Sequence, residues 1–413
     1  MSATDVLQKR FAAALMPNYG LPTVALARGQ GCQVWDVDGR EYLDLFAGIA
    51  VSALGHAHPA LTEAVTRQVT TLAHTSNLFM HEPGIELAER LLALLGGGDP
   101  ADARVFFANS GTEANEAAIK LVRRHWQKQG QNLARRTFVA TENGFHGRTM
   151  GALALTGKAS IREPFAPFGI DVRFVPFGDA DALRAAAGPD CAAVFVEPCQ
   201  GEAGVIPPPP GYLRAAREIC AASGALLVVD EIQSGIGRTG HWFAHQAEGV
   251  TPDVLTLAKG LGGGLPIGAC VGFGPYGSVL GPGDHGSTFG ANPVSCAAAL
   301  AVLATIESDG LLANATTVGE QLSNGVAAIS HPLLAGVRGQ GLWLAAILTE
   351  HAAPPVEAAA RRAGFLVNPV QPDAIRLAPP LIISAGQASA FLDTLPAILD
   401  DATVLADTAT GAS

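Results

Sequence analysis

The chain has 413 residues, 48% of them hydrophobic and 15% charged, and its formal net charge is −11. This length and composition fit one large domain with a substantial core together with a smaller one. Because Lys and Arg form no stripe along this acidic sequence, we expect no nucleic-acid partner. The sequence has no apolar run of about 18 residues, and Phe11 to Met16 is too short for a secretory signal. We therefore expect a cytoplasmic protein without a membrane partner.

The cysteines are scattered, at Cys32, Cys191, Cys199, Cys220, Cys270 and Cys296. None forms a Cys-x-x-Cys pair or shares ligand spacing with a histidine, which argues against zinc, iron–sulfur and disulfide frameworks. We expect buried, reduced thiols and no metal site.

The first 55 residues have the pattern of short strands and turns. Gln33 to Val37 leads through Asp38-Gly39 into Tyr42 to Leu45, which predicts a β-hairpin. We expect residues 1–55 to form an edge of the smaller domain.

From about residue 56 the sequence alternates between helical segments and short apolar strands, at residues 105–108, 137–140, 193–196 and 225–229. Strands that are apolar on both faces and separated by helices predict an α/β fold with a mainly parallel sheet covered by helices. Each strand ends in polar or glycine-rich sequence, and ligands of such sheets bind beyond the carboxyl ends of the strands. Residues 56–308 are therefore expected to form a large domain with one ligand crevice.

Beyond residue 308, a helical segment at 311–330 precedes strand-like runs near residues 342–344 and 375–377. This order predicts a small α+β domain over residues 309–402. Residues 403–413 are small and polar without a periodic apolar face, so we expect a mobile tail there.

Asn109-Ser110-Gly111-Thr112 joins a strand to a strongly helical run. Free amides and hydroxyls at a helix start suit a phosphate group, although Ser110 or Thr112 could equally be a helix cap. Nucleotide motifs do not explain such a site. No Walker A loop surrounds Gly157-Lys158, and the G-x-G-x-x-G match at residues 235–240 has the pattern of a loop.

Asp230 directly follows the predicted strand at residues 225–229, and Lys259 is followed by four glycines within five residues. An acid at the end of a buried strand can stay ionised against a protonated pyridine nitrogen, and a lysine can form an imine with an aldehyde. The glycines are expected to give the lysine room to move. Taken singly, Asp230 could be a helix cap and Lys259 a solvated side chain.

An ordered set of motifs extends over most of the chain, from about Tyr19 to Ile383. It comprises residues 107–115, 144–149, 196–198, 200–202, 230–233, 237–240, 258–259 and 287–290. Together these motifs resemble the class III (subgroup II) aminotransferases of fold type I, which use pyridoxal 5'-phosphate. The resemblance implies a large domain with a mainly parallel seven-stranded sheet, a small α+β domain, and a homodimer with shared active sites.

The resemblance also implies roles for individual residues. Lys259 and Asp230 are the expected catalytic residues, on the cofactor aldehyde and the ring nitrogen. The other expected cofactor contacts are Ser110, Gly111 and Thr112 at the phosphate, Thr288 at the phosphate of the neighbouring subunit, Phe145 and Ile232 on the two ring faces, and Gln233 at the ring hydroxyl.

A transaminase must accept an amino donor and a keto acid in one pocket. The resemblance assigns Arg148 to the distant carboxylate and Arg376 to the carboxylate beside the reacting carbon. Glu202 is then a candidate gate that pairs with Arg376 when a terminal amine enters and releases it for glutamate, with an ordinary salt bridge as the alternative. Tyr19 and Asn77 are further candidate substrate residues.

The implied reaction transfers the terminal amine of N2-acetylornithine to 2-oxoglutarate. Ornithine, succinylornithine, acetyl-lysine and 4-aminobutyrate are alternative donors within the family, and an isomerase or an inactive binding scaffold are alternatives outside it. Two positions depart from the usual family pattern, since Ala203 and Ala291 stand where many relatives have glycine.

Overall fold

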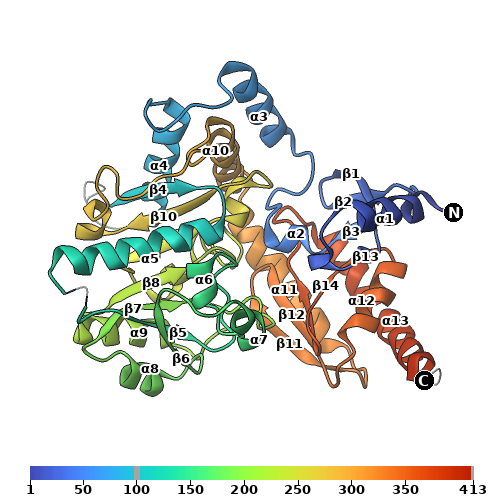
Figure 1. Ribbon diagram of the computed structural model, residues 1–413. Coiled ribbons are helices and arrows are strands. Elements are labelled where there is room, and N and C mark those ends of the chain that lie inside the picture. Colours follow the sequence, from blue (N-terminus) through green and yellow to red (C-terminus); the bar gives the residue numbers. More distant parts are fainter. Residues whose placement is uncertain (97–102, 132, 411–413) are drawn as a thin grey trace.

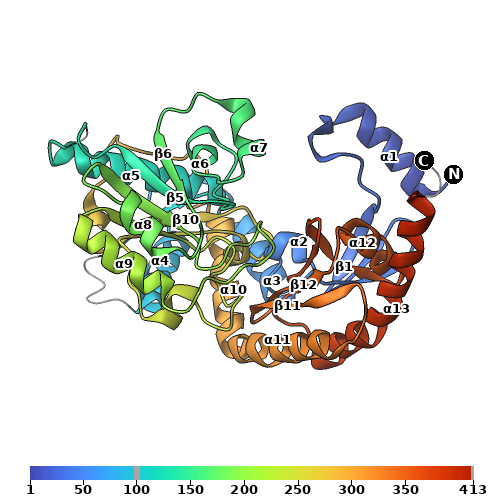
Figure 2. The ribbon, with the colours of Figure 1, turned by 90° about the horizontal axis from the view of Figure 1, so that it is seen from below.

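The computed structural model describes residues 1–96, 103–131 and 133–410, with side chains up to residue 404. Two bodies lie side by side in Figures 1 and 2. One is built around a large sheet, and the other combines two small sheets with α11 (Leu311–Ala328), α12 (Ala353–Arg362) and α13 (Ala385–Thr410). The α/β fold class is confirmed, whereas the domain limits after residues 55, 308 and 402 stay predictions.

The large sheet has seven strands, and all run in the same direction except β10, which is antiparallel to β4 and β9. This confirms the mainly parallel sheet. Its order is β4 (Arg104–Ala108), β10 (Gly268–Gly272), β9 (Val254–Leu257), β8 (Leu226–Asp230), β7 (Cys191–Val196), β5 (Thr137–Thr141) and β6 (Asp171–Val175).

Alternate side chains of the central strands enter two different cores, because successive residues of a strand point to opposite faces. Phe138 and Phe195 pack with α5 (Gly111–Lys128) on one face. Val139 and Val194 belong to the core on the other face. That face is covered by α4 (Glu82–Leu95), α8 (Ala180–Ala186), α9 (Tyr212–Ser223) and α10 (Pro293–Ser308). The sheet is therefore buried on both sides, which explains its continuous apolar strands.

The predicted hairpin is confirmed as β2 (Gln33–Asp36) and β3 (Glu41–Asp44). It lies in a sheet of order β1 (Leu26–Gln30), β2, β3 and β13 (Phe365–Leu366), so the N-terminal strands pair with a strand from the C-terminal part. The predicted C-terminal strands are also present, in an antiparallel sheet. Its order is β11 (Leu334–Gln340), β12 (Trp343–Leu348), β15 (Ala374–Leu377) and β14 (Asn368–Gln371).

The remaining helices are short or lie at the surface. They are α1 (Ala3–Ala14), α2 (Ala47–Ala50), α3 (Pro59–Thr71), α6 (Met150–Ala154) and α7 (Ala159–Arg162). Within the described residues no single helix has the length and hydropathy of a membrane span, and α10 with α11 meets these criteria only as a pair bent by 68°.

α13 continues through Thr410, so it includes residues 403–410, which were predicted to belong to a tail. The mobility of that tail stays a prediction. Residues 411–413 lie outside the described part of the chain.

Residues 235–240 form turns, as predicted for the G-x-G-x-x-G match. Arg238 in this loop is buried and donates hydrogen bonds to the carbonyl oxygens of Leu342 and Pro379. The glycine-rich loop therefore ties the large body to the smaller one.

Candidate active site

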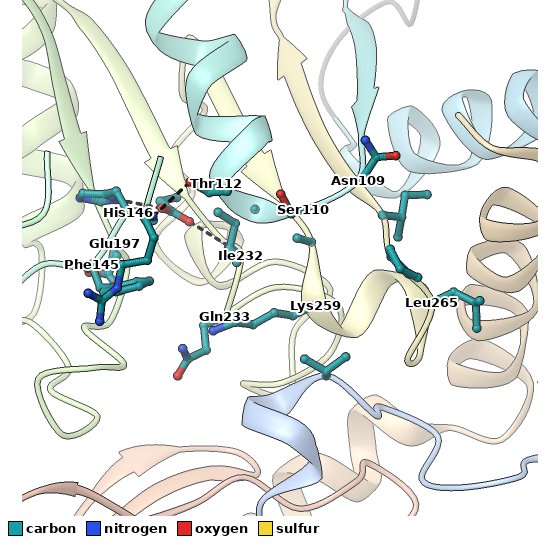
Figure 3. A pocket seen from close by; sticks show the side chains of 18 of the residues that line it. Asn109, Ser110, Thr112, Phe145, His146, Glu197, Ile232, Gln233, Lys259 and Leu265 are labelled. Atoms are coloured by element: carbon teal, nitrogen blue, oxygen red, sulfur yellow. Dashed lines mark hydrogen bonds and ion pairs between the residues drawn. The ribbon is translucent and has the colours of Figure 1, made fainter. Parts of the chain in front are cut away.

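A cavity of about 360 Å³ lies beyond the carboxyl ends of the large sheet's strands. The segments after β4, β5, β7 and β8 reach it, as the sequence predicted, and so does the segment after β9. Its lining includes Ser110, Gly111 and Thr112, Phe145 to Arg148, Glu197, Asp230, Ile232, Gln233 and Lys259 (Figure 3).

The start of α5 forms one wall of the cavity. Ser110 is the N-cap, and its hydroxyl accepts a hydrogen bond from the amide of Glu113 at 3.3 Å. The first amides of a helix have no intrahelical acceptor, and the helix dipole makes this end positive. A side chain at Gly111 would meet Ile232, since its Cβ would lie 2.7 Å from the Cδ1 atom. The wall therefore offers amide donors to an anion in a space that only glycine leaves open.

Asp230 is buried at the end of β8 and is held on both carboxylate oxygens. Oδ2 accepts hydrogen bonds from Asn115 Nδ2 and His146 Nδ1, both at 2.8 Å. Oδ1 accepts from the amide of Ile232 at 3.0 Å. Burial opposes a charge on His146, but the hydrogen bond and charge of Asp230 raise its pKa overall. The contact with Asp230 therefore favours the protonated form of His146.

Lys259 lies directly after β9 with its backbone in the left-handed region, at φ 44°. Burial lowers the pKa of its amine to about 8, although the charge of Glu202 acts in the opposite direction. Figure 3 shows its side chain extending in the direction of Gln233. A buried amine with a lowered pKa is more often neutral and can act as a nucleophile or a base.

Two of the glycines after Lys259 allow close packing of the chain. A Cβ at Gly262 would lie 2.9 Å from Ile267 Cγ2, and one at Gly263 would lie 2.7 Å from Val302 Cγ2. A Cβ at Gly264 would meet nothing within 4 Å, so the predicted room for the lysine stays a prediction.

Glu202 and Arg376 form an ion pair, with Arg376 Nη1 2.6 Å from Glu202 Oε1. The Arg376 side chain is 2% exposed and that of Glu202 is 33% exposed. Arg376 also donates to Gln233 Oε1 at 2.8 Å and to Asn368 Oδ1 at 2.7 Å. Burial raises the pKa of Glu202, but the charges of Arg376 and Lys259 lower it overall. The guanidinium is therefore already occupied by a carboxylate.

The sequence model of the family described as Aminotransferase class-III matches residues 15–399. The acetylornithine aminotransferase of Mycobacterium tuberculosis is 57% identical over 402 residues, which cover 97% of this chain and 98% of the relative. That of Streptomyces coelicolor is 55% identical, with 99% and 98% covered. The chain belongs to the class-III aminotransferases. The solved structure of the Toxoplasma gondii ornithine aminotransferase is also similar, with a TM-score of 0.91, 31% identity, and 99% of this chain and 97% of that chain covered.

As a class-III member, the protein is a pyridoxal-phosphate-dependent aminotransferase, which sets aside the isomerase and scaffold alternatives. The cavity residues fit this cofactor. The amides at the start of α5 suit its phosphate, the Asp230 carboxylate suits a protonated ring nitrogen, and the Lys259 amine suits its aldehyde. Phe145 and Ile232 offer apolar surface to the ring.

Among the predicted substrate residues of this class-III aminotransferase, Arg148 lines the cavity. Its guanidinium carbon lies 5.5 Å from the centre of the Phe145 ring. Tyr19 is 88% exposed and lies outside the residues that line the cavity. Asn77 instead donates to the carbonyl oxygen of Gly290 at 2.9 Å. Thr288 is exposed next to that segment, so the cavity of one chain brings together only part of the predicted set.

Three residues of the site were missed in the sequence. Asn115 and His146 hold Asp230, and Glu197 accepts a hydrogen bond from the amide of Phe145 at 3.0 Å. Burial raises the pKa of Glu197 to about 7, while the charge of His146 lowers it. All three lie inside the motifs that carry the family resemblance, so their positions pointed to the site. The sequence did not show which groups they would bond.

The two departures from the family pattern differ in their surroundings. Ala203 is buried beside Glu202, in a segment that runs on to Gly204 with φ +102°. Ala291 adopts φ 58°, a left-handed conformation that costs a residue with a Cβ about 1 kcal/mol more than glycine. The methyl group at position 291 is therefore tolerated with backbone strain.

Proposed function

We propose that this aminotransferase transfers the terminal amino group of N2-acetylornithine to 2-oxoglutarate, forming N-acetylglutamate 5-semialdehyde and glutamate, as a step of arginine biosynthesis. The curated relatives named acetylornithine aminotransferase, at 55–57% identity over nearly the whole chain, support the donor. The observation that carries the proposal is the paired state of Arg376.

An unpaired arginine beside Lys259 would favour substrates with a carboxylate next to the reacting carbon. When Glu202 is paired with its guanidinium, the charge of Arg376 is neutralised. This suits a substrate with a terminal amine, which has no carboxylate next to the reacting carbon. Arg148 then holds the distant carboxylate of acetylornithine, since a guanidinium binds a carboxylate with two hydrogen bonds. The exposed position of Arg148 at the cavity agrees with this role.

Glutamate needs the opposite arrangement, because its reacting amine sits beside a carboxylate. Glu202 must then leave Arg376, and its partial exposure lets water replace the lost partner. Removal of either charge from a buried pair would be costly, but a carboxylate that is one-third exposed can move into water. Glu202 therefore acts as a gate between the two substrates.

Pyridoxal phosphate supplies, when bound, the electron sink that stabilises negative charge on the reacting carbon. Asp230 keeps a proton on the ring nitrogen, and its three hydrogen bonds fix the carboxylate for that task. Lys259 moves a proton at the substrate carbon, for which its lowered pKa is suited. Gln233, which bonds Arg376, is placed to contact both the ring and the gate.

A homodimer with shared active sites is part of the proposal. Met16, Tyr19, Leu78, Phe79 and Met80 are each at least 70% exposed in the single chain. Leu78, Phe79 and Met80 are consecutive, and exposed apolar side chains grouped in this way are typical of a surface that another chain covers. Thr288 of each chain is proposed to reach the phosphate site of the other. A cytoplasmic location stays a prediction from the sequence.

The test is a spectroscopic titration of the purified holoenzyme with N-acetylornithine alone. We expect the visible absorbance of the bound cofactor to bleach and to return when 2-oxoglutarate is added. Bleaching by ornithine or 4-aminobutyrate but not by N-acetylornithine would replace the proposed donor. Sedimentation of the same sample tests the dimer, and a monomer with full activity would contradict shared sites.

A further inference from the structure

The segment that carries Glu202 is a compact loop, here called the gate loop and defined as Gly201 to Val205. Two backbone hydrogen bonds close its base, between Gln200 and Ile206, at 3.0 and 2.9 Å. The amides of Gly204 and Val205 both donate to the carbonyl oxygen of Gly201, at 3.1 and 3.2 Å. These bonds set the shape of the loop but do not attach its tip to the rest of the protein.

The tip is attached to the rest of the protein by the sheet of β11, β12, β15 and β14. Gln371 Nε2, from β14, donates to the carbonyl oxygen of Glu202 at 2.6 Å. Arg338 Nε, from β11, donates to the carbonyl oxygen of Gly204 at 2.8 Å. The two bonds lie on either side of Ala203, so the sheet holds the backbone at both Glu202 and Gly204.

The contact is close as well as polar. A Cβ at Gly204 would lie 2.6 Å from Arg338 Nη2 and 3.4 Å from Gln371 Cγ. Arg376, on β15 of the same sheet, makes the only ion pair that the described residues offer Glu202. The sheet of β11, β12, β15 and β14 therefore carries Arg376 and also holds the backbone of its partner Glu202.

We propose that Gln371 and Arg338 are positioning residues for donor specificity, which hold the gate-loop backbone so that only the side chain of Glu202 exchanges between its two positions. This inference rests on the proposed function, since it assumes that Glu202 is a gate. Neither residue is assigned to touch substrate or cofactor. Their effect is exerted through the distance between Glu202 and Arg376.

The direction of the effect follows from the geometry. Loss of either bond frees a carbonyl of the gate loop, which lets the backbone move away from the sheet and weakens the pairing of Glu202 with Arg376. Arg376 is then available more often to a substrate carboxylate. Reaction with the terminal amine should slow, and reaction with glutamate should be maintained.

The experiment uses the full-length holoenzyme with Gln371→Leu and Arg338→Met, which remove each donor at similar size. Gln340→Leu is the matched control, because Gln340 is exposed on β11, the strand of Arg338. Each variant is mixed in single turnover with N-acetylornithine or with glutamate, and cofactor absorbance gives two rates. We expect the ratio of the first rate to the second to fall about three- to tenfold, as for one lost hydrogen bond.

Two further variants separate positioning from general damage. Arg338→Lys keeps a donor and should restore part of the ratio. In a Glu202→Ala background, Gln371→Leu should change the ratio no further, because the side chain that it positions is gone.

Equal slowing of both rates would show a merely structural role and overturn the inference. A ratio that Glu202→Ala leaves unchanged would overturn the gate, and the positioning role with it. If the wild-type enzyme ignores N-acetylornithine, the proposed donor fails on its own. The same ratio is then measured with the terminal amine that the enzyme does use, and an unchanged ratio in both variants would overturn the positioning role alone.

Discussion

The two carboxylates Asp230 and Glu202 are held in different ways. On the cofactor side, Asp230 is buried, and three groups from three segments bond its carboxylate. On the substrate side, the Glu202 carboxylate is one-third exposed and depends on Arg376 and a longer bond from Gln233, at 3.3 Å. Under the proposed function, the chemistry common to both substrates depends on tightly held groups, whereas discrimination between the substrates depends on the more weakly held Glu202.

The largest effect is expected for Lys259→Ala, on the cofactor side. Removal of the amine takes away both the covalent attachment and the proton carrier, so turnover should fall by about a thousandfold or more. The measurement is the steady-state rate with both substrates, with cofactor content checked by absorbance. Activity near that of the wild type would mean that another group moves the proton.

Asp230→Asn should have the second largest effect. The amide has nearly the same shape but no charge, so it stabilises a protonated ring nitrogen less, and both half-reactions should slow by about a hundredfold. Because Asp230 serves both substrates, the ratio of the two rates should stay constant. A change in that ratio would contradict the proposal that Asp230 acts equally on both substrates.

Glu202→Ala tests the substrate side. We expect the rate with N-acetylornithine to fall about tenfold relative to the rate with glutamate, the equivalent of about 1.4 kcal/mol. Single-turnover absorbance with each substrate gives the two rates. Equal losses would favour an ordinary salt bridge over a gate.

The smallest effect concerns pH and the Lys259 amine. Burial lowers its pKa to about 8, so the neutral fraction should rise about fivefold between pH 7 and pH 8 and less than twofold above that. Lys259 of cofactor-free protein should therefore react with added pyridoxal phosphate at a rate that levels off near pH 8. An ordinary lysine would keep gaining rate up to about pH 10, and that result would contradict the effect of burial.

Much of the fold could be predicted, because strands buried on both faces leave continuous apolar runs and the hairpin carries its own turn signal. The end of α13 could not, since residues 403–410 have no periodic apolar face that would indicate a helix. In the site, Asp230 and Lys259 lie at the carboxyl ends of two apolar strands, so their convergence could be expected from the rule that such ends meet at one edge of a parallel sheet. The packing of Gly263 against Val302 could not be predicted, because it depends on a helix distant in the sequence.

The sequence by itself determined the family, the α/β architecture, and the residue types at the cofactor, since all three are local patterns in a fixed order. Only the tertiary structure showed that His146 and Asn115 hold Asp230 and that Gln371 and Arg338 hold the backbone next to Glu202. Glu202 and Gln371 are 169 residues apart in the chain. Hydrogen bonds between groups so distant in sequence depend on distances of a few ångströms that only the packed sheets fix.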